Sequence, residues 1–275
     1  MQYTKILFDN IDKETSDALQ GLLSGIDEIT GTEILSTALV AYCDAATFPG
    51  EALDAIATQL RISYTTSVIR EENWNAAWEE DFKPISIDDF CHIRAGFHPP
   101  PAASFRHEIL ITPKMSFGTG HHETTQLVIR QMQHLDFKGK TVFDFGTGTG
   151  ILAILAEQLG AQQITAIDND KWSIENSIEN INGNGCGHIT VTADDITTVA
   201  GTNASFNIIL ANINRQILLQ YMPQLNDLLQ PGGYMLISGF LEADIPLLQA
   251  AVQGQELREV NLLSANNWVC MLLRK

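Results

Sequence analysis

The most constraining feature of the sequence is a glycine-rich turn between an apolar run and a helix-period stripe. Residues 141–145 are β-branched or aromatic apart from one acid, and three glycines follow on alternate positions, Gly146, Gly148 and Gly150. Apolar residues then recur with helical spacing from Ile151. This order predicts a strand, a tight turn and a helix whose first N–H groups are unpaired. A ligand can therefore approach the main chain closely at this turn.

The glycine spacing argues against two common nucleotide sites. Dinucleotide-binding turns follow G-x-G-x-x-G and triphosphate-binding loops contain a lysine, whereas this turn is G-x-G-x-G without a lysine. The next predicted strand, residues 163–167, ends at Asp168, and an acid at this point can bind the diol of a ribose. We therefore predict a nucleoside site without a strong phosphate cradle. The alternative is that the glycines only form the turn and Asp168 only caps a helix.

Strands and helices alternate along residues 112–275, which favours an α/β domain with a mostly parallel, seven-stranded Rossmann-like sheet. The last two predicted strands, around 257–263 and 268–273, leave no room for a helix between them and predict an antiparallel hairpin. The other predicted strands are 141–145, 163–167, 189–193, 206–211 and 233–238, with helices at 149–159, 171–182 and near 242–252 and a helical region ending at Leu229.

Residues 1–70 predict a small ferredoxin-like α+β domain with the order β-α-β-β-α-β. The strands are expected at 3–8, around Ile29, at 39–43 and at 62–69, and the helices carry apolar stripes at Leu19, Leu22, Leu23 and Ile26 and at Leu53, Ile56 and Leu60. No cluster of reactive side chains occurs in this domain, so we interpret it as a substrate-recognition module. Residues 71–111 are expected to link the two domains, with an amphipathic helix carrying Trp74, Trp78 and Phe82 followed by short strands.

The composition limits the partners of the chain. There are 33 acidic and 16 basic residues, a net charge of −17 without any Lys/Arg cluster, which disfavours nucleic-acid binding and favours a basic partner. The alternative is that the acidity serves only solubility. No apolar run of about 18 residues and no signal peptide is present, so we expect no membrane segment and a cytoplasmic location. The four scattered cysteines form no zinc or disulfide pattern.

Candidate reactive residues follow the ends of the predicted strands, where open α/β sheets bind ligands. The fourth strand ends at Asn212, whose amide oxygen can accept a hydrogen bond from an attacking amine; the alternative is a helix N-cap. Asp194 and Asp195 follow the third strand and either accept from an adenine amino group or cap a helix.

The sequence also contains His121, His122 and Glu123 in succession. Three adjacent residues do not share a helix face, so we do not predict a metal site there. The two histidines are also poor candidates for a catalytic base. We instead expect a lid loop, with Thr124 and Thr125 either capping the next helix or contacting a cofactor.

Three motifs together resemble the ribosomal protein L11 methyltransferase family (PrmA), which belongs to the class I S-adenosylmethionine-dependent methyltransferases. They are FGTGHHETT at 117–125, DFGTGTG at 144–150 and ANI at 211–213, and the linker residues around Trp74 also look like that family. The resemblance implies methyl transfer to lysine side chains and the N-terminal α-amine of L11, which the small N-terminal domain holds. It implies that the cofactor contacts Thr125, Gly146, Asp168 and Asn212, to which we add the neighbouring Gly148; we assign the catalytic role to Asn212.

Other functions are less compatible with these motifs. Glutamine methyltransferases of release factors carry N-P-P-[YF] where this chain has Asn212-Ile213-Asn214. A methyltransferase acting on another basic protein or a small amine, and a non-catalytic S-adenosylmethionine-binding adaptor, remain as alternatives. We expect a monomer that uses S-adenosylmethionine without a metal and without a dedicated base.

Overall fold

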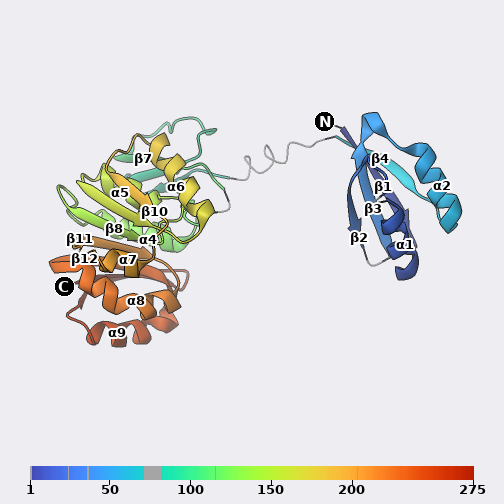
Figure 1. The fold of residues 1–275 in the computed structure, drawn as a ribbon. Helices are drawn as coiled ribbons and strands as arrows, with labels where there is room; N and C mark the ends of the chain where they lie inside the picture. Colours follow the sequence, from blue (N-terminus) through green and yellow to red (C-terminus); the bar gives the residue numbers. More distant parts are fainter. Residues whose placement is uncertain (1, 24, 36, 71–81, 115, 203) are drawn as a thin grey trace. The chain divides into compact units, whose positions relative to one another are not determined.

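The computed structural model describes residues 2–23, 25–35, 37–70, 82–114, 116–202 and 204–275 (Figure 1). The chain divides into two compact units, Met1–Phe82 and Lys83–Lys275, which we call the N-terminal unit and the C-terminal unit. The predicted linker residues Trp74 and Trp78 lie outside the described residues.

The N-terminal unit has the predicted β-α-β-β-α-β order. Its elements are β1 (Gln2–Asp9), α1 (Lys13–Leu23), β2 (Ile29–Ile34), β3 (Ala38–Asp44), a 3-10 turn η1 (Ala45–Thr47), α2 (Gly50–Leu60) and β4 (Thr65–Arg70). The sheet order is β2-β3-β1-β4 and all its pairs are antiparallel, as expected for a ferredoxin-like fold. The last strand begins at Thr65 rather than residue 62, because the chain is still bound to the end of α2 at that point: Arg61 is left-handed at φ 54° and the Ile62 N–H donates to the Ala57 carbonyl at 3.0 Å.

The C-terminal unit contains a seven-stranded sheet in the order β10-β9-β8-β11-β12-β14-β13. All pairs are parallel except that β14 runs antiparallel to both β12 and β13, which confirms the predicted terminal hairpin. The elements are α4 (Glu123–Met132), β8 (Thr141–Phe145), α5 (Ile151–Gln158), β9 (Gln163–Ile167), α6 (Lys171–Gly183), β10 (Ile189–Thr192), α7 (Ile196–Ala200), β11 (Phe206–Asn212), α8 (Arg215–Leu228), β12 (Leu229–Leu241), η2 (Glu242–Asp244), α9 (Ile245–Gln253), β13 (Arg258–Ala265) and β14 (Trp268–Arg274).

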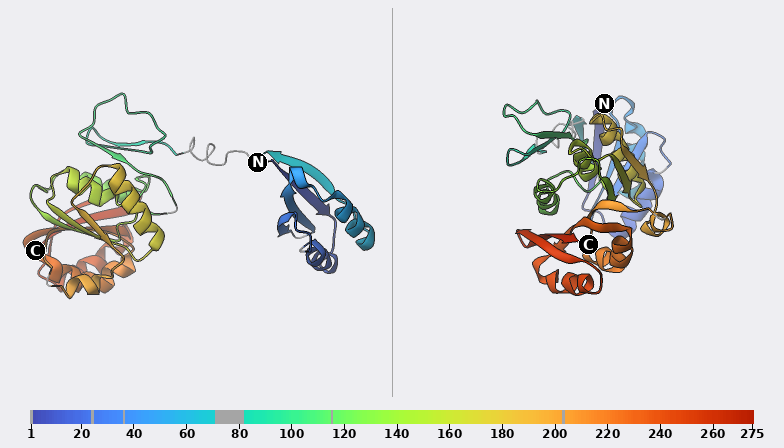
Figure 2. Two further views of the ribbon diagram at one scale, coloured as in Figure 1. Left: turned by 45° about the horizontal axis from the view of Figure 1, so that its top comes forward. Right: turned by 90° about the vertical axis from the view of Figure 1, so that its left-hand side faces the viewer.

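Helices cover both faces of this sheet, with α4, α5 and α6 on one side and α7, α8 and α9 on the other (Figures 1 and 2). Each face of the sheet forms a hydrophobic core with the helices that cover it. Successive side chains of a strand point to opposite faces and therefore pack alternately into the two cores. In β8, Val142 packs with α4 and α5, while Phe143 and Phe145 pack with α8. From the sequence, α7 is expected only as the helix that Asp194 or Asp195 would cap, since its five residues are too few to show helical periodicity.

Three short strands precede this domain: β5 (Ile85–Ile87), β6 (Cys91–Arg94) and β7 (His107–Leu110). They form a separate small sheet in which β6 pairs with β5 antiparallel and with β7 parallel. Their buried residues Ile87, Ile93 and Ile109 join the same core as α4 and α5, so this sheet is part of the C-terminal unit. Across the described ranges, no helix has both the length and the apolar character needed to cross a membrane.

Candidate active site

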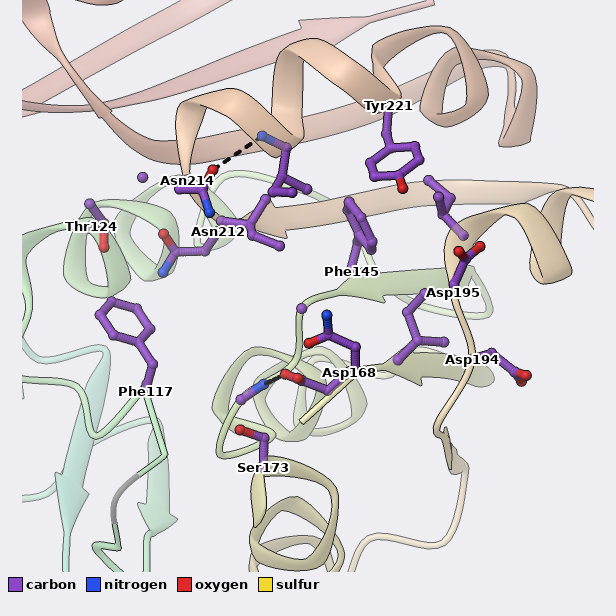
Figure 3. A pocket seen from close by; sticks show the side chains of 18 of the residues that line it. Phe117, Thr124, Phe145, Asp168, Ser173, Asp194, Asp195, Asn212, Asn214 and Tyr221 are labelled. Atoms are coloured by element: carbon purple, nitrogen blue, oxygen red, sulfur yellow. Dashed lines mark hydrogen bonds between the residues drawn. The ribbon is translucent and has the colours of Figure 1, made fainter. Parts of the chain in front are cut away.

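A pocket of about 590 Å³ opens at the carboxyl ends of β8, β9 and β11 (Figure 3). Four of the predicted site residues line it together: Gly146, Gly148, Asp168 and Asn212. In the sheet, β8 lies between β9, the next strand in sequence, and β11. The pocket therefore lies where the strand order reverses. Open α/β sheets bind ligands at this point, and the volume falls in the ~300–1,000 Å³ range of small-molecule sites.

The glycine turn is built so that a ligand or a neighbouring chain segment can lie directly against its backbone. Gly146, Gly148 and Gly150 have φ of 76°, 55° and 82°, a region that favours glycine. A Cβ atom on Gly148 would lie 2.3 Å from the carbonyl oxygen of Phe117, and one on Gly146 would lie 3.0 Å from the Ile213 side chain. The backbone conformation favours glycine at both positions, and the close approach of a backbone oxygen additionally requires it at Gly148.

Asp168 anchors the turn to the next strand. Its Oδ2 accepts a hydrogen bond from the Gly148 N–H at 2.9 Å, and its Oδ1 accepts one from the Asp170 N–H at 3.0 Å. The N-cap of α6 is Asp170, which accepts from the Ser173 N–H at 2.9 Å, so Asp168 does not cap the helix. Each Asp168 oxygen has a further lone pair, and the carboxylate lines the pocket.

Asp144, the first residue of the DFGTGTG motif, is buried and is not among the residues that line the pocket. Its Oδ2 accepts from the Thr147 hydroxyl at 2.6 Å. Burial raises the pKa of Asp144 to about 7, with a further contribution from the nearby Asp168 charge. Asp144 therefore holds the turn from inside the protein.

Asn212 lies at the end of β11 with its amide oriented toward α4. Its Nδ2 donates to the Thr125 hydroxyl at 3.4 Å, while its Oδ1 is buried and has no hydrogen-bond partner among the described residues. The cap of α8 is Asn214, which accepts from the Ile217 N–H at 3.1 Å (Figure 3). A buried carbonyl oxygen without a donor is costly, so Asn212 is suited to accept a hydrogen bond from a bound molecule.

Thr125 does not line the pocket within the described part of the chain. It is fully buried in α4 behind Asn212, and the adjacent Thr124 faces the pocket instead. The α4 helix is capped by His122, whose Nδ1 accepts from the Thr124 N–H at 3.3 Å, so neither threonine is the cap. Thr125 supports Asn212, and its contact with a cofactor stays a prediction.

Three aromatic rings form the pocket wall beside Asn212 and Thr124. The His122 ring lies 5.4 Å from Phe117 and 4.7 Å from Trp268, measured between ring centroids. His122 Nδ1 also lies 2.8 Å from the Thr124 hydroxyl. Because Nδ1 accepts the Thr124 N–H, the ring proton of neutral His122 is on Nε2. In this arrangement His122 is a structural cap and not a free proton acceptor.

Trp268 was missed by the sequence interpretation. It begins β14 after a tight turn in which Asn266 and Asn267 have φ of 49° and 67°, the signature of a two-residue hairpin. The Asn266 amide donates to Glu123 at 2.9 Å, which fixes the turn against the start of α4. The Asn-Asn pair before Trp268 was the available sequence signal.

Of the remaining candidates, Asp195 and His121 have structural partners. Asp195 caps α7, and hydrogen bonds from Thr197 lower the pKa of its carboxyl. Asp194 and Asp195 both line the pocket. His121 Nε2 lies 3.1 Å from the Lys83 carbonyl oxygen and Nδ1 lies 3.1 Å from the Thr119 hydroxyl. In the described ranges no three His, Cys, Asp or Glu side chains are grouped as metal ligands.

The chain is similar to proteins of one known family. Residues 15–275 match the family described as Ribosomal protein L11 methyltransferase (PrmA). The protein of that name from Phocaeicola vulgatus is 41% identical over 237 residues, which cover 84% of each chain. The one from Bacteroides fragilis is 37% identical over 282 residues, which cover 98% of this chain and 99% of the relative. A crystal structure of ribosomal protein L11 methylase from Lactobacillus delbrueckii subsp. bulgaricus is 30% identical with a TM-score of 0.65, covering 70% of this chain and 98% of that chain. The chain belongs to the ribosomal protein L11 methyltransferase family.

Proposed function

We propose that this protein transfers methyl groups from S-adenosylmethionine to lysine side chains and to the N-terminal α-amine of ribosomal protein L11. Family membership makes the chain a protein methyltransferase. The observation that carries the finer proposal is a single pocket with two chemically different sides. The glycine turn and Asp168 form one side, and the unpartnered Asn212 oxygen and three aromatic rings form the other.

The first side fits the nucleoside part of S-adenosylmethionine. Asp168 has lone pairs for the ribose hydroxyls, and Gly146 and Gly148 leave no side chain between the backbone and the pocket. Asn212 and, through it, Thr125 would hold the end nearest the reacting group. When bound, S-adenosylmethionine supplies a methyl group attached to a positively charged sulfur.

The second side fits an amine. Asn212 Oδ1 is a neutral acceptor that can orient an amine N–H, while Phe117 and Trp268 restrict the approach and exclude water. Deprotonation at pH 7 costs roughly 1.4 kcal/mol for an α-amine of pKa ~8 and roughly 4.6 kcal/mol for a lysine of pKa ~10.4. Both costs are small beside the ~8–23 kcal/mol that enzymes remove, so solvent can take the proton before the amine docks. We assign most of the catalysis to positioning.

The charge of the chain supports a basic protein substrate. A net charge of −17 attracts a basic ribosomal protein and repels the phosphates of a nucleic acid. We assign substrate recognition to residues 1–70, a connecting role to residues 71–111 and catalysis to residues 112–275. The proposal includes a monomeric, cytoplasmic enzyme that does not contact nucleic acid directly.

One labelling experiment tests the proposal. The purified protein is mixed with S-adenosylmethionine carrying a labelled methyl group and with dissociated ribosomal proteins, which are then separated. Label on L11, at lysines and the N-terminus, supports the proposal, and Asn212→Ala should reduce the rate. Label only on another basic protein would favour the alternative substrate, and cofactor binding without labelling of any protein would favour a non-catalytic adaptor.

A further inference from the structure

Asn180 in α6 and Asn184, the C-cap residue of that helix, both bind the chain segment that leads into the FGTGHH loop, residues 117–122. Asn184 accepts from the Leu110 N–H at 2.9 Å and donates to the Leu110 carbonyl at 2.7 Å. One turn earlier, Asn180 accepts from the Thr112 N–H at 2.8 Å and donates to the Thr149 carbonyl at 2.9 Å. Of these two residues, only Asn180 therefore joins this segment to the glycine turn.

Thr149 is in turn hydrogen-bonded to the loop residues Phe117 and Gly118. Its N–H donates to the Phe117 carbonyl at 2.9 Å and its hydroxyl donates to the Gly118 carbonyl at 2.6 Å. Phe117 lines the pocket, and its carbonyl oxygen is the atom against which Gly148 is packed. The hydrogen bonds thus form a continuous path from α6 through the glycine turn to the loop on the other side of the pocket.

We propose that Asn180 is a positioning residue for cofactor binding: through Thr149 it holds Gly148 and Phe117 at the separation that the pocket requires. The inference rests on the proposed use of S-adenosylmethionine. Asn180 is 2% exposed and Thr149 is fully buried, so neither bond competes with water. One partner is a donor and the other an acceptor, so an asparagine amide satisfies both whereas a carboxylate accepts only.

Asn180→Asp and Asn184→Asp form a matched pair for the test. Both changes keep the side-chain shape, place an acceptor against a backbone carbonyl and add one acidic group. Asn184 also donates to the Asn180 carbonyl at 2.7 Å, so Asn184→Asp disturbs the same helix turn without touching Thr149. Calorimetry measures S-adenosylmethionine affinity, thermal unfolding measures stability, and amide exchange of residues 116–120 is followed in the ligand-free protein.

We expect Asn180→Asp to weaken S-adenosylmethionine binding about tenfold, the size expected for one lost buried hydrogen bond, and to speed exchange in residues 116–120. Asn184→Asp should lower the unfolding temperature while the affinity stays within about twofold of wild type. Equal affinity losses in the two variants would show a general effect on folding, and wild-type affinity in Asn180→Asp would also refute the proposal.

A second pair covers the case in which Asn180→Asp does not fold. Thr149→Val removes the hydroxyl that donates to Gly118, and Thr149→Ser keeps it. Weaker S-adenosylmethionine binding in the valine variant, with recovery in the serine variant, supports the path; equal affinities refute it. If the wild-type protein does not bind S-adenosylmethionine at all, the proposed function fails instead.

Discussion

Gly148→Ala should lower the free energy of unfolding by more than the cost of a positive φ angle alone. The added Cβ would lie 2.3 Å from the Phe117 carbonyl oxygen, whereas a carbon and an oxygen approach to roughly 3.3 Å, so the two segments must separate by about 1 Å. The same carbonyl accepts the Thr149 N–H at 2.9 Å, and that bond is strained by the movement. Crowding of this kind costs about 1–3 kcal/mol and the left-handed conformation about 1–2 kcal/mol.

Gly139→Ala is the matched control. Gly139 also has a positive φ, 69°, but nothing lies within 4 Å of the Cβ position, so only the conformational cost applies. We therefore expect Gly148→Ala to lose about 2–5 kcal/mol of unfolding free energy and Gly139→Ala about 1–2 kcal/mol. For a unit of this size each kcal/mol lowers the unfolding temperature by roughly 2–4 °C.

Thermal unfolding and calorimetric titration with S-adenosylmethionine together measure the effect. Only Gly148→Ala should also weaken cofactor binding, because it moves Phe117 and the Gly148 N–H that donates to Asp168. Equal stability losses in the two variants, or unchanged cofactor affinity in Gly148→Ala, would show that the close contact with Phe117 does not shape the pocket.

Four further outcomes are expected. Asp168→Ala should weaken S-adenosylmethionine binding by about 100-fold or more, since two hydrogen bonds to a charged group are worth ~1.5–3 kcal/mol each; unchanged calorimetric affinity would remove the ribose role. Asn212→Ala should slow single-turnover transfer more than it weakens cofactor binding, and a wild-type rate would count against an amine-orienting role. Deleting residues 1–70 should spare cofactor binding and abolish L11 methylation, so full-rate methylation by the truncated enzyme would contradict the recognition role. In the wild type, the raised pKa of Asp144, about 7, means that the folded state binds the proton more tightly than the unfolded state does. The contribution of Asp144 to the free energy of unfolding therefore falls as the pH rises from about 4 to 7. Asp144→Asn should remove this fall. Urea unfolding at pH 5 and pH 8 measures that difference, and identical pH slopes in the two proteins would show that Asp144 does not titrate as described.

The sequence by itself determined the elements whose signals are local. The glycine turn, the acid at Asp168 and the alternation of strands and helices depend on neighbours a few residues apart, so their spacing predicted both the α/β class and the edge of the sheet that carries the site. The same reasoning left Asp168 and Asn212 with two roles each. Because Asp170 and Asn214 cap α6 and α8, the structure leaves Asp168 and Asn212 without a capping role, and both residues line the pocket.

Only the tertiary structure decided the features made by distant segments. Trp268 meets His122 because a hairpin turn 143 residues away in sequence binds Glu123, and Asn180 reaches Thr149 across 31 residues. Thr125 lies behind Asn212 because β11 carries that side chain against α4. Such contacts follow from how helices and strands pack together, and no pattern of nearby residues encodes them.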